Sequence, residues 1–270
     1  MSGLNLLNVL VVVVTLTPRV LASPSCHDPS GTDYEHYRCF NFSSPDDFSR
    51  LLERPQLHKD LHFVLKDSSL SHLPEGAFSQ INASVLELNN VQLDVFNLED
   101  ENPLDGLQTS LRRLILGYGS TIPTSWAPFS TLEKLTTNLE VVGIRHCNLK
   151  VFQRSMLPRP APKLWRLDLF KNELSSLPAD FSADMPALRS VTVEHNQIKT
   201  FEEQTFAPLT NNDTNRVRFL GNPLHCDCKL RFVLSYPPSW LNAICETPEA
   251  LQNQSLKTLT AEQLTCADGA

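Results

Sequence analysis

The 270-residue chain has few glycines, nine in all, and no glycine-rich loop of the kind that binds phosphate groups. It has no G-x-S-x-G motif, and the histidines His58 and His62 flank Lys59 where the metal-binding H-E-x-x-H pattern requires glutamate. The stretch around them reads as the entry to a strand, where four-residue spacing forms no helical metal pair. These absences indicate a protein that is not an enzyme and needs no metal or cofactor.

Basic residues are also few relative to acidic ones. The 23 Lys and Arg stand against 30 Asp and Glu, giving a formal net charge of -7, and no basic cluster occurs. This composition argues against binding to nucleic acid or to anionic membrane surfaces. No second apolar run of about 18 residues follows the N-terminal one, so we expect no membrane insertion. The final LTCADGA also lacks the hydrophobic tail of a lipid-anchor signal.

The apolar run near the N-terminus extends from Leu4 to Leu16, which is short for a membrane span. The residues Val20, Leu21 and Ala22 fit a cleavage site after Ala22, although no basic residue precedes the run. We therefore expect a signal peptide over residues 1–22 and a secreted, extracellular protein. An uncleaved anchor or a buried strand would be the alternatives.

The clearest internal repeat begins at Leu164 and reads LWRLDLFKNELSSLP. Its apolar residues follow L-x-x-L-x-L-x-x-N-x-L, which is neither a helical stripe nor a simple alternation. The frame starts near residues 60, 83, 111, 139, 164, 188 and 214, at spacings of about 23 to 28 residues. The position of the pattern's Asn is held, from the first frame to the last, by Ser68, Val91, Gly119, Cys147, Asn172, Asn196 and Asn222.

This pattern resembles the leucine-rich repeat family over roughly residues 60 to 224. The resemblance implies an α/β fold, a curved solenoid with parallel strands on its concave side and irregular or 3₁₀ segments on its convex side. One repeat cannot bury its own apolar row, whereas stacked repeats share a continuous core. An amide at the Asn position can bond the backbone groups of the bend, which Val91 and Gly119 cannot do. We therefore expect the N-terminal half to be less regular.

Four of the seven cysteines follow the repeats: Cys226, Cys228, Cys245 and Cys266. The C-x-C spacing of the first two is too tight for the usual C-x₂₋₄-C zinc arrangement and differs from the C-x-x-C of redox pairs. Because an exported protein meets an oxidising compartment, we expect disulfides. Spacing alone leaves three connectivities open.

The same segment resembles the cysteine-rich C-terminal flank of extracellular leucine-rich repeat proteins. The matched features include Trp240-Leu241 and a C-x-x-P-x-x-L stretch from Cys245. The sequence departs from the family pattern at Gln254, where the family often has glycine. The resemblance implies the pairs Cys226–Cys245 and Cys228–Cys266.

We expect Cys26 and Cys39 to form a disulfide in an N-terminal cap, although many relatives have four cysteines there. Cys147 remains without a partner and is interpreted as a buried free thiol; an exposed thiol forming an intermolecular disulfide is the alternative.

Several other motifs have simple interpretations. The N-x-S/T triplets at Asn41, Asn82, Asn212 and Asn253 are candidate glycosylation sites in an exported protein. The acidic stretch NLEDENPLD lacks the order of a calcium loop and is interpreted as a solvated loop. The stretch LPRPAPK, which starts at Leu157, is interpreted as an extended connection.

The strand residues that face the concave side remain as candidates for binding, because the family usually binds there. Arginine and aromatic side chains are typical interface anchors. We place Arg113 and Arg166 one column away from the residues that we expect to be central. The complete candidate set is Arg113, Tyr118, Arg145, His146, Arg166, Phe170, Lys171, Glu194 and His195.

These observations predict a signal peptide over 1–22, an N-terminal cap over 23–59, about seven repeats over 60–220 and a cysteine-rich cap over 221–270. The expected function is non-catalytic recognition of a protein partner, whose identity the sequence does not specify. The chain also loosely resembles small secreted arthropod leucine-rich repeat proteins, some named after the non-catalytic subunit of a luciferase. A stabilising subunit of an extracellular enzyme complex is therefore the alternative.

Overall fold

The computed structural model describes residues 22–27, 36–52, 61–121 and 138–266. The predicted signal peptide therefore lies outside the described residues except for Ala22, and so does His58. None of the helices in the described ranges has the length and apolar character that crossing a membrane requires.

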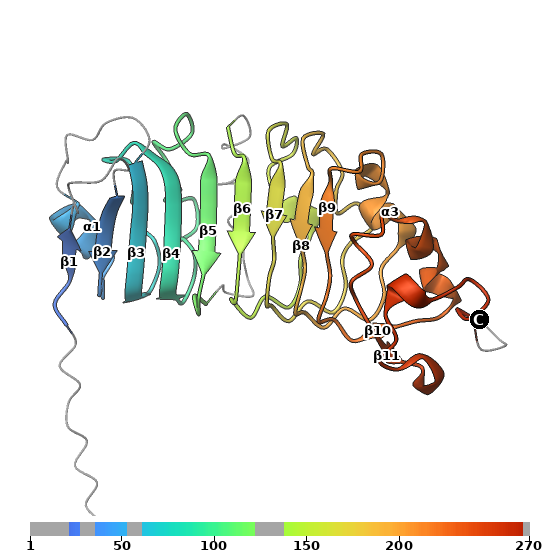
Figure 1. The fold of residues 1–270 in the computed structure, drawn as a ribbon. Coiled ribbons are helices and arrows are strands. Elements are labelled where there is room, and N and C mark those ends of the chain that lie inside the picture. The colour runs from blue at the N-terminus through green and yellow to red at the C-terminus, as the bar shows by residue number, and fades with distance from the viewer. Residues whose placement is uncertain (1–21, 28–35, 53–60, 122–137, 267–270) are drawn as a thin grey trace, which may run out of the picture.

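One sheet runs from the N-terminal end to the C-terminal cap, with its strands in sequence order (Figure 1). All neighbours pair in parallel except the first two strands, which are antiparallel. The strands of this sheet are β1 (Ser25–His27), β2 (His36–Phe40), β3 (Leu61–Leu70), β4 (Ala83–Leu93), β5 (Arg113–Gly117), β6 (Val141–Ile144), β7 (Arg166–Asp168), β8 (Ser190–Thr192) and β9 (Arg216–Arg218).

Short helices and irregular chain connect these strands and form the C-terminal end. The α-helices are α1 (Asp46–Leu51) and α3 (Glu203–Phe206). The 3₁₀ helices are η1 (Arg154–Met156), η2 (Ala207–Leu209), η3 (Cys228–Ser235), η4 (Glu249–Leu251) and η5 (Leu256–Thr258). A second sheet of two parallel strands joins β10 (Leu224–His225) to β11 (Cys245–Thr247). The chain is thus a leucine-rich repeat solenoid with disulfide caps.

The repeating leucines form the core because the strands pair in the register of the sequence frame. In β5, Leu114 and Leu116 are 2% and 3% exposed, and each lies beside the equivalent buried residue of β4 and β6. One such row, from β3 to β9, contains Phe63, Leu86, Leu114, Val142, Leu167, Val191 and Val217. Burying a row of this kind is favourable only when the repeats stack, which explains why the repeats fold together.

Buried asparagines bond the bends of the C-terminal repeats. Asn196 is 1% exposed; its Nδ2 donates to the carbonyls of Leu169 and Val193 at 3.0 Å each, and its Oδ1 accepts from the backbone N–H of Leu174 at 3.1 Å. Asn172 and Asn222 make equivalent bonds. One amide therefore satisfies backbone groups that the strand ladder leaves free.

The N-terminal half has longer strands, but its pairing is less regular, because the register of β3 against β4 shifts between Leu61 and His62. β3 and β4 are the longest strands of the sheet, with 10 and 11 residues. Serines take over the bonding of the bends: Ser68 Oγ accepts from the N–H of Phe42 and donates to a carbonyl, and Ser120 Oγ accepts from Val91 N–H and donates to the carbonyls of Leu88 and Gly117. Ser120 lies one residue beyond the frame position, which is why the sequence pattern does not reveal it.

Aromatic rings join the repeats to the C-terminal cap. Consecutive rings have centroids 5.3 to 5.9 Å apart, mostly edge to face, an arrangement that aromatic pairs prefer. The series runs through Phe152, Phe181, Phe206, Phe201, Phe232, Tyr236 and Trp240. Trp240, 2% exposed, ends the series in the cap, and its indole N–H donates to the carbonyl of Asn215 at 3.0 Å.

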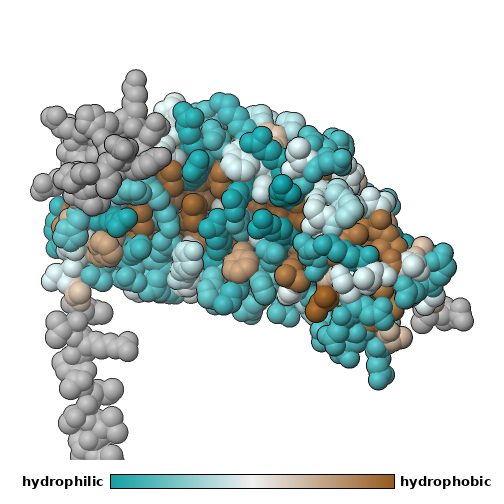
Figure 2. All heavy atoms as spheres, viewed as in Figure 1, coloured by the Kyte–Doolittle hydropathy of each residue, from teal (hydrophilic) through white to brown (hydrophobic). Residues whose placement is uncertain are grey.

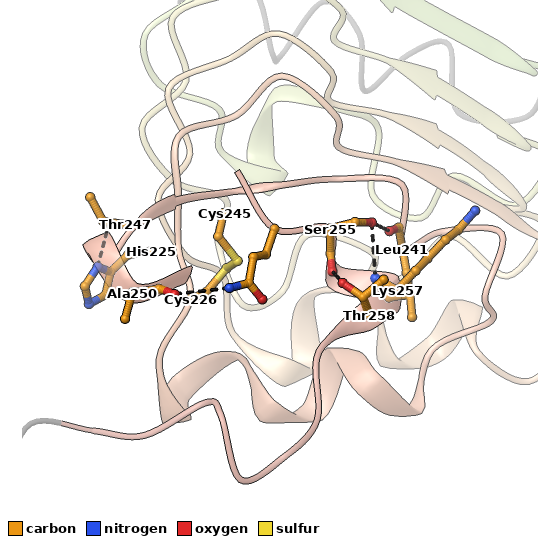
Figure 3. Close-up of a disulfide and its surroundings, with 10 residues drawn as sticks. His225, Cys226, Leu241, Cys245, Thr247, Ala250, Ser255, Lys257 and Thr258 are labelled. Carbon is orange, nitrogen blue, oxygen red and sulfur yellow. Dashed lines mark hydrogen bonds between the residues drawn. A yellow bond between two sulfur atoms is a disulfide. The ribbon is translucent and has the colours of Figure 1, made fainter. Parts of the chain in front are cut away.

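Disulfides close both ends. Cys26 is joined to Cys39 across β1 and β2. In the C-terminal cap Cys226 is joined to Cys245 beside the β10–β11 pair, where His225 Nδ1 and Thr247 Oγ1 are 2.7 Å apart (Figure 3). A further disulfide joins Cys228 to Cys266. Bridges of this kind stabilise small caps because they restrict the unfolded chain.

The connection after η1 is held by a buried arginine. Arg154 is 2% exposed, its Nε donates to the carbonyl of Ala183 at 2.6 Å, and its Nη1 donates to the carbonyls of Leu157 and Pro158 at 3.2 and 3.0 Å. Burial lowers the pKa of Arg154. The stretch LPRPAPK is therefore anchored to the core by a cation that the sequence pattern did not single out.

Candidate binding face

The concave side of the sheet presents the strand residues that alternate with the buried leucines. They form three rows across the sheet, which we call the first, middle and last rows. The first row is His36, His62, Val85, Arg113, Val141, Arg166, Ser190 and Arg216. The middle row is Arg38, Val64, Glu87, Ile115, Gly143, Asp168, Thr192 and Arg218. The last row is Phe40, Lys66, Asn89, Gly117, Arg145, Phe170, Glu194 and Leu220.

These rows carry a charge opposite to that of the whole protein. Among their residues seven are Lys or Arg and three are Asp or Glu, whereas the chain has a net charge of -7. Figure 2 shows a mainly hydrophilic surface across the strands, interrupted by smaller hydrophobic areas. A surface of this sign attracts acidic partners and repels basic ones.

The strongest local arrangement on this face is built around Asp168, which is 4% exposed. Arg145 Nε and Nη2 and Arg166 Nη2 all reach Asp168 Oδ2, at 2.9, 2.9 and 3.0 Å. Asp168 Oδ1 accepts from the backbone N–H of Phe170 at 3.2 Å. Charge-assisted hydrogen bonds of this kind fix side-chain geometry, so two guanidinium groups are held in place over one carboxylate. We call these four residues the Asp168 cluster.

Five of the predicted residues lie in the rows, Glu194 among them in the last row, and the other four follow the last row. Arg145, Arg166 and Phe170 meet in the Asp168 cluster, and the ring of Phe170 lies edge-on to that of His195 at 5.4 Å between centroids. Arg113 lies in the first row of β5, two strands from Arg166. Asp168, which fixes the cluster, was not among the predicted residues, although its middle position in the L-x-L frame would have indicated it.

The sequence pattern predicted central positions for Tyr118, His146, Lys171 and His195, but the structure places all four at the ends of their strands. Each follows the last row directly and has a positive φ, from 48° to 58°, so it turns the chain at the end of its strand. Their side chains are exposed, and Tyr118 reaches 64%. They therefore form the rim of the face.

Gly221, after the last row of β9, also has a positive φ, and the close packing at this position requires glycine. It has φ +74°, and a Cβ placed there would lie 2.6 Å from Nδ1 of His195. Any side chain would therefore displace the His195 ring, because the backbone of the last repeat packs directly against it.

Histidines and a glutamate meet at the N-terminal end of the same face. The rings of His36 and His62 have centroids 4.8 Å apart, and His62 Nε2 lies 2.8 Å from Glu87 Oε2. The hydrogen bond from His62 is the largest cause that lowers the pKa of Glu87, and desolvation lowers the pKa of His36. The described residues contain no group of three metal-ligating side chains with the geometry to hold an ion.

The remaining candidates are a thiol and the N-x-S/T sites. Cys147 is buried; its Sγ lies 3.2 Å from the carbonyl oxygen of Arg145, and desolvation raises the thiol pKa to about 12. Of the candidate glycosylation sites, Asn82, Asn212 and Asn253 are exposed and Asn41 is partly buried. Only an exposed asparagine can accept a glycan on the folded chain, and three of the four meet that condition.

Known proteins with similar sequences are leucine-rich repeat proteins. Mouse Toll-like receptor 9 is 31% identical over 186 residues, which are 66% of this chain and 17% of the receptor. Rat osteomodulin is 30% identical over 169 residues, 53% of this chain and 38% of that protein. The chain thus spans well under half the length of these curated relatives. No protein-family model matches it.

Solved structures show the same fold. Human trophoblast glycoprotein (5T4) has a TM-score of 0.55 at 20% identity and covers 86% of this chain and 94% of its own. A chain of the octameric complex of Latrophilin 3, Unc5D and FLRT2 (LRR) has a TM-score of 0.58 at 22% identity and covers 84% of this chain and 74% of its own. A chain of the mouse RP105/MD-1 complex has a TM-score of 0.56 at 18% identity and covers 78% of this chain and 41% of its own.

Proposed function

We propose that this leucine-rich repeat chain is a secreted, extracellular recognition module that binds an acidic protein partner through its concave face and has no catalytic activity of its own. The observation that carries the proposal is the Asp168 cluster. It holds Arg145 and Arg166 by their side chains and Phe170 by its backbone N–H, and arginine and aromatic residues are common interface anchors. Because the geometry of the two arginines is already fixed, little of their side-chain entropy is lost on binding.

The charge of the face supports an acidic partner. Asp168 neutralises only one of the two guanidinium groups that it holds, and Arg113 forms no ion pair among the residues that the structure describes. The similar proteins support a protein partner in general terms, because RP105 is found with MD-1 and FLRT2 with Latrophilin 3 and Unc5D. Disulfide caps and exposed N-x-S/T sites are in keeping with an extracellular location.

Affinity capture with the secreted protein tests the proposal. The test variant combines Arg145→Ala with Phe170→Ala, and the matched control combines Lys199→Ala with Val151→Ala, which also removes one cation and one hydrophobic side chain. Lys199 and Val151 are exposed and lie outside the three rows. The test variant should lose at least about tenfold in affinity for the captured partner, and the control should keep it. Undiminished capture by the test variant would exclude this face.

A further inference from the structure

The last strand of the sheet, β9, has a free edge. Arg216 N–H donates to the carbonyl of Arg189 at 2.7 Å, and the carbonyl of Arg218 accepts from Val193 N–H at 2.8 Å. Arg216 and Arg218 thus direct their backbone groups at β8, so those of Val217 between them point the other way. Within the described ranges neither the N–H nor the carbonyl of Val217 is hydrogen bonded. An unpaired edge of this kind can accept a further strand.

A cavity of 540 Å³ lies along this edge, between β9 and the C-terminal cap. Its size is within the range of small-ligand and short-peptide sites. Arg216 and Arg218 line it from the strand, Leu220 from the turn that follows, and Asn242 and Lys257 from the cap. Lys257 belongs to η5, whose first turn is fixed by the Ser255 side chain, and its own side chain extends away from that turn (Figure 3).

The cavity is basic. Arg216, Arg218 and Lys257 are exposed, and none of them forms an ion pair with any residue that the structure describes. Glu194 is the single carboxylate in the lining, so the cations outnumber it by two. Three unpaired cations close together repel one another, and an acidic occupant would relieve that repulsion.

We propose that an acidic peptide segment binds in this cavity as an added strand along β9. Its backbone would pair with the N–H and carbonyl of Val217, and its carboxylates would lie at alternate positions, opposite Arg216 and Arg218. Lys257 would approach the same carboxylates from the cap, and the partly exposed Leu220, at 38%, would contact an apolar residue of the peptide. This site lies at the C-terminal end of the sheet and does not depend on the Asp168 cluster.

A peptide fits better than another polyanion because the edge offers both a donor and an acceptor. The N–H of Val217 could bind a sulfate or carboxylate oxygen, but its carbonyl needs a donor. A peptide strand supplies both from one residue, whereas a sulfated glycan supplies a donor only through a hydroxyl that has no fixed spacing along the edge. The repeat distance of a strand also matches the spacing of Arg216 and Arg218 in β9.

Binding of short synthetic peptides to the full chain, measured by isothermal titration calorimetry, tests the proposal. The first probe is a blocked peptide of about eight residues in which glutamate and threonine alternate. The second has glutamine for each glutamate. The acidic peptide should bind at least about tenfold more tightly, Arg218→Ala should remove about tenfold, and Lys229→Ala, an exposed lysine of the cap outside the cavity, should change nothing.

Backbone N-methylation separates strand pairing from simple charge attraction. One acidic peptide is methylated at its glutamate nitrogens and another at its threonine nitrogens, and only one of these two sets faces β9 in an added strand. One methylated peptide should therefore lose binding while the other keeps it. Equal binding by both, or tighter Arg218-dependent binding of a heparin tetrasaccharide than of the acidic peptide, would overturn the proposal. The Arg145→Ala, Phe170→Ala variant should bind the peptide as wild type does. Failure of the peptide proposal can therefore be distinguished from failure of the proposal for the Asp168 cluster.

Discussion

Replacing Asn172 with alanine should be among the most damaging single changes in the repeats. The Asn172 Nδ2 donates to the carbonyl of Ile144 at 2.7 Å, and Oδ1 accepts from the N–H groups of Cys147 and Leu149 at 3.1 Å each. Asn172→Ala leaves these three groups buried without a partner. Each such group costs about 1–3 kcal/mol of unfolding free energy. Because the surrounding backbone can relax in part, each cost lies near the lower figure, and the total loss is about 4 kcal/mol.

A further hydrogen bond of Asn172 can be removed without leaving a buried group unpaired, which limits the loss of unfolding free energy. The Asn172 Nδ2 also donates to the carbonyl of Leu169, but Asn196 Nδ2 donates to the same carbonyl at 3.0 Å. That carbonyl stays satisfied in the variant. A loss of about 4 kcal/mol remains large against a total unfolding free energy of about 5–15 kcal/mol for a typical domain.

Urea unfolding followed by circular dichroism, with the disulfides intact, measures this loss. Asn211→Ala is the matched control, because Asn211 is exposed and its replacement should change the unfolding free energy by less than about 0.5 kcal/mol. Asn172→Ser should fall between the two, since Ser68 bonds the bend of an N-terminal repeat through a hydroxyl. An Asn172→Ala variant as stable as the control would refute the assignment of the bends to the side-chain amide.

Three further outcomes follow from the structure. The Cys147 thiol, with its pKa raised to about 12, should resist alkylation by iodoacetamide at pH 8 in the folded protein and react when urea is added; reaction at the same rate in both states would contradict its burial. The pKa of Glu87 is lowered mainly by the hydrogen bond from His62, so its ionised form stabilises the fold above the unfolded pKa of about 4.5 and this contribution is lost as the pH falls through the lower folded value. Wild type should therefore lose more stability than Glu87→Gln between pH 6 and pH 3 in urea titrations, and parallel losses would argue against the pairing. Replacing both Cys226 and Cys245 with alanine should lower the unfolding free energy by about 3 kcal/mol, and an unchanged urea midpoint would mean that this bridge does not stabilise the cap.

The sequence alone determined the architecture, because its signals are local and repeated. The leucines of each frame must be buried, and their spacing of about two dozen residues leaves stacking as the way to bury them. The register between strands follows from the same residues, since a shift of one position would turn every leucine outward. The C-x-C pair and the flank around Cys245 likewise indicate disulfides by their sequence alone.

Only the tertiary structure decided which polar residues act together. Parallel strands bring side chains about 25 positions apart into contact, and no local pattern reports whether Asp168 meets Arg145 or whether Glu87 meets His62. The same holds for Ser120, which bonds the bend from one residue beyond the expected place. The free edge of β9 and the basic cavity beside it exist only because the cap replaces the next repeat, a relation between segments that appears once the chain has folded.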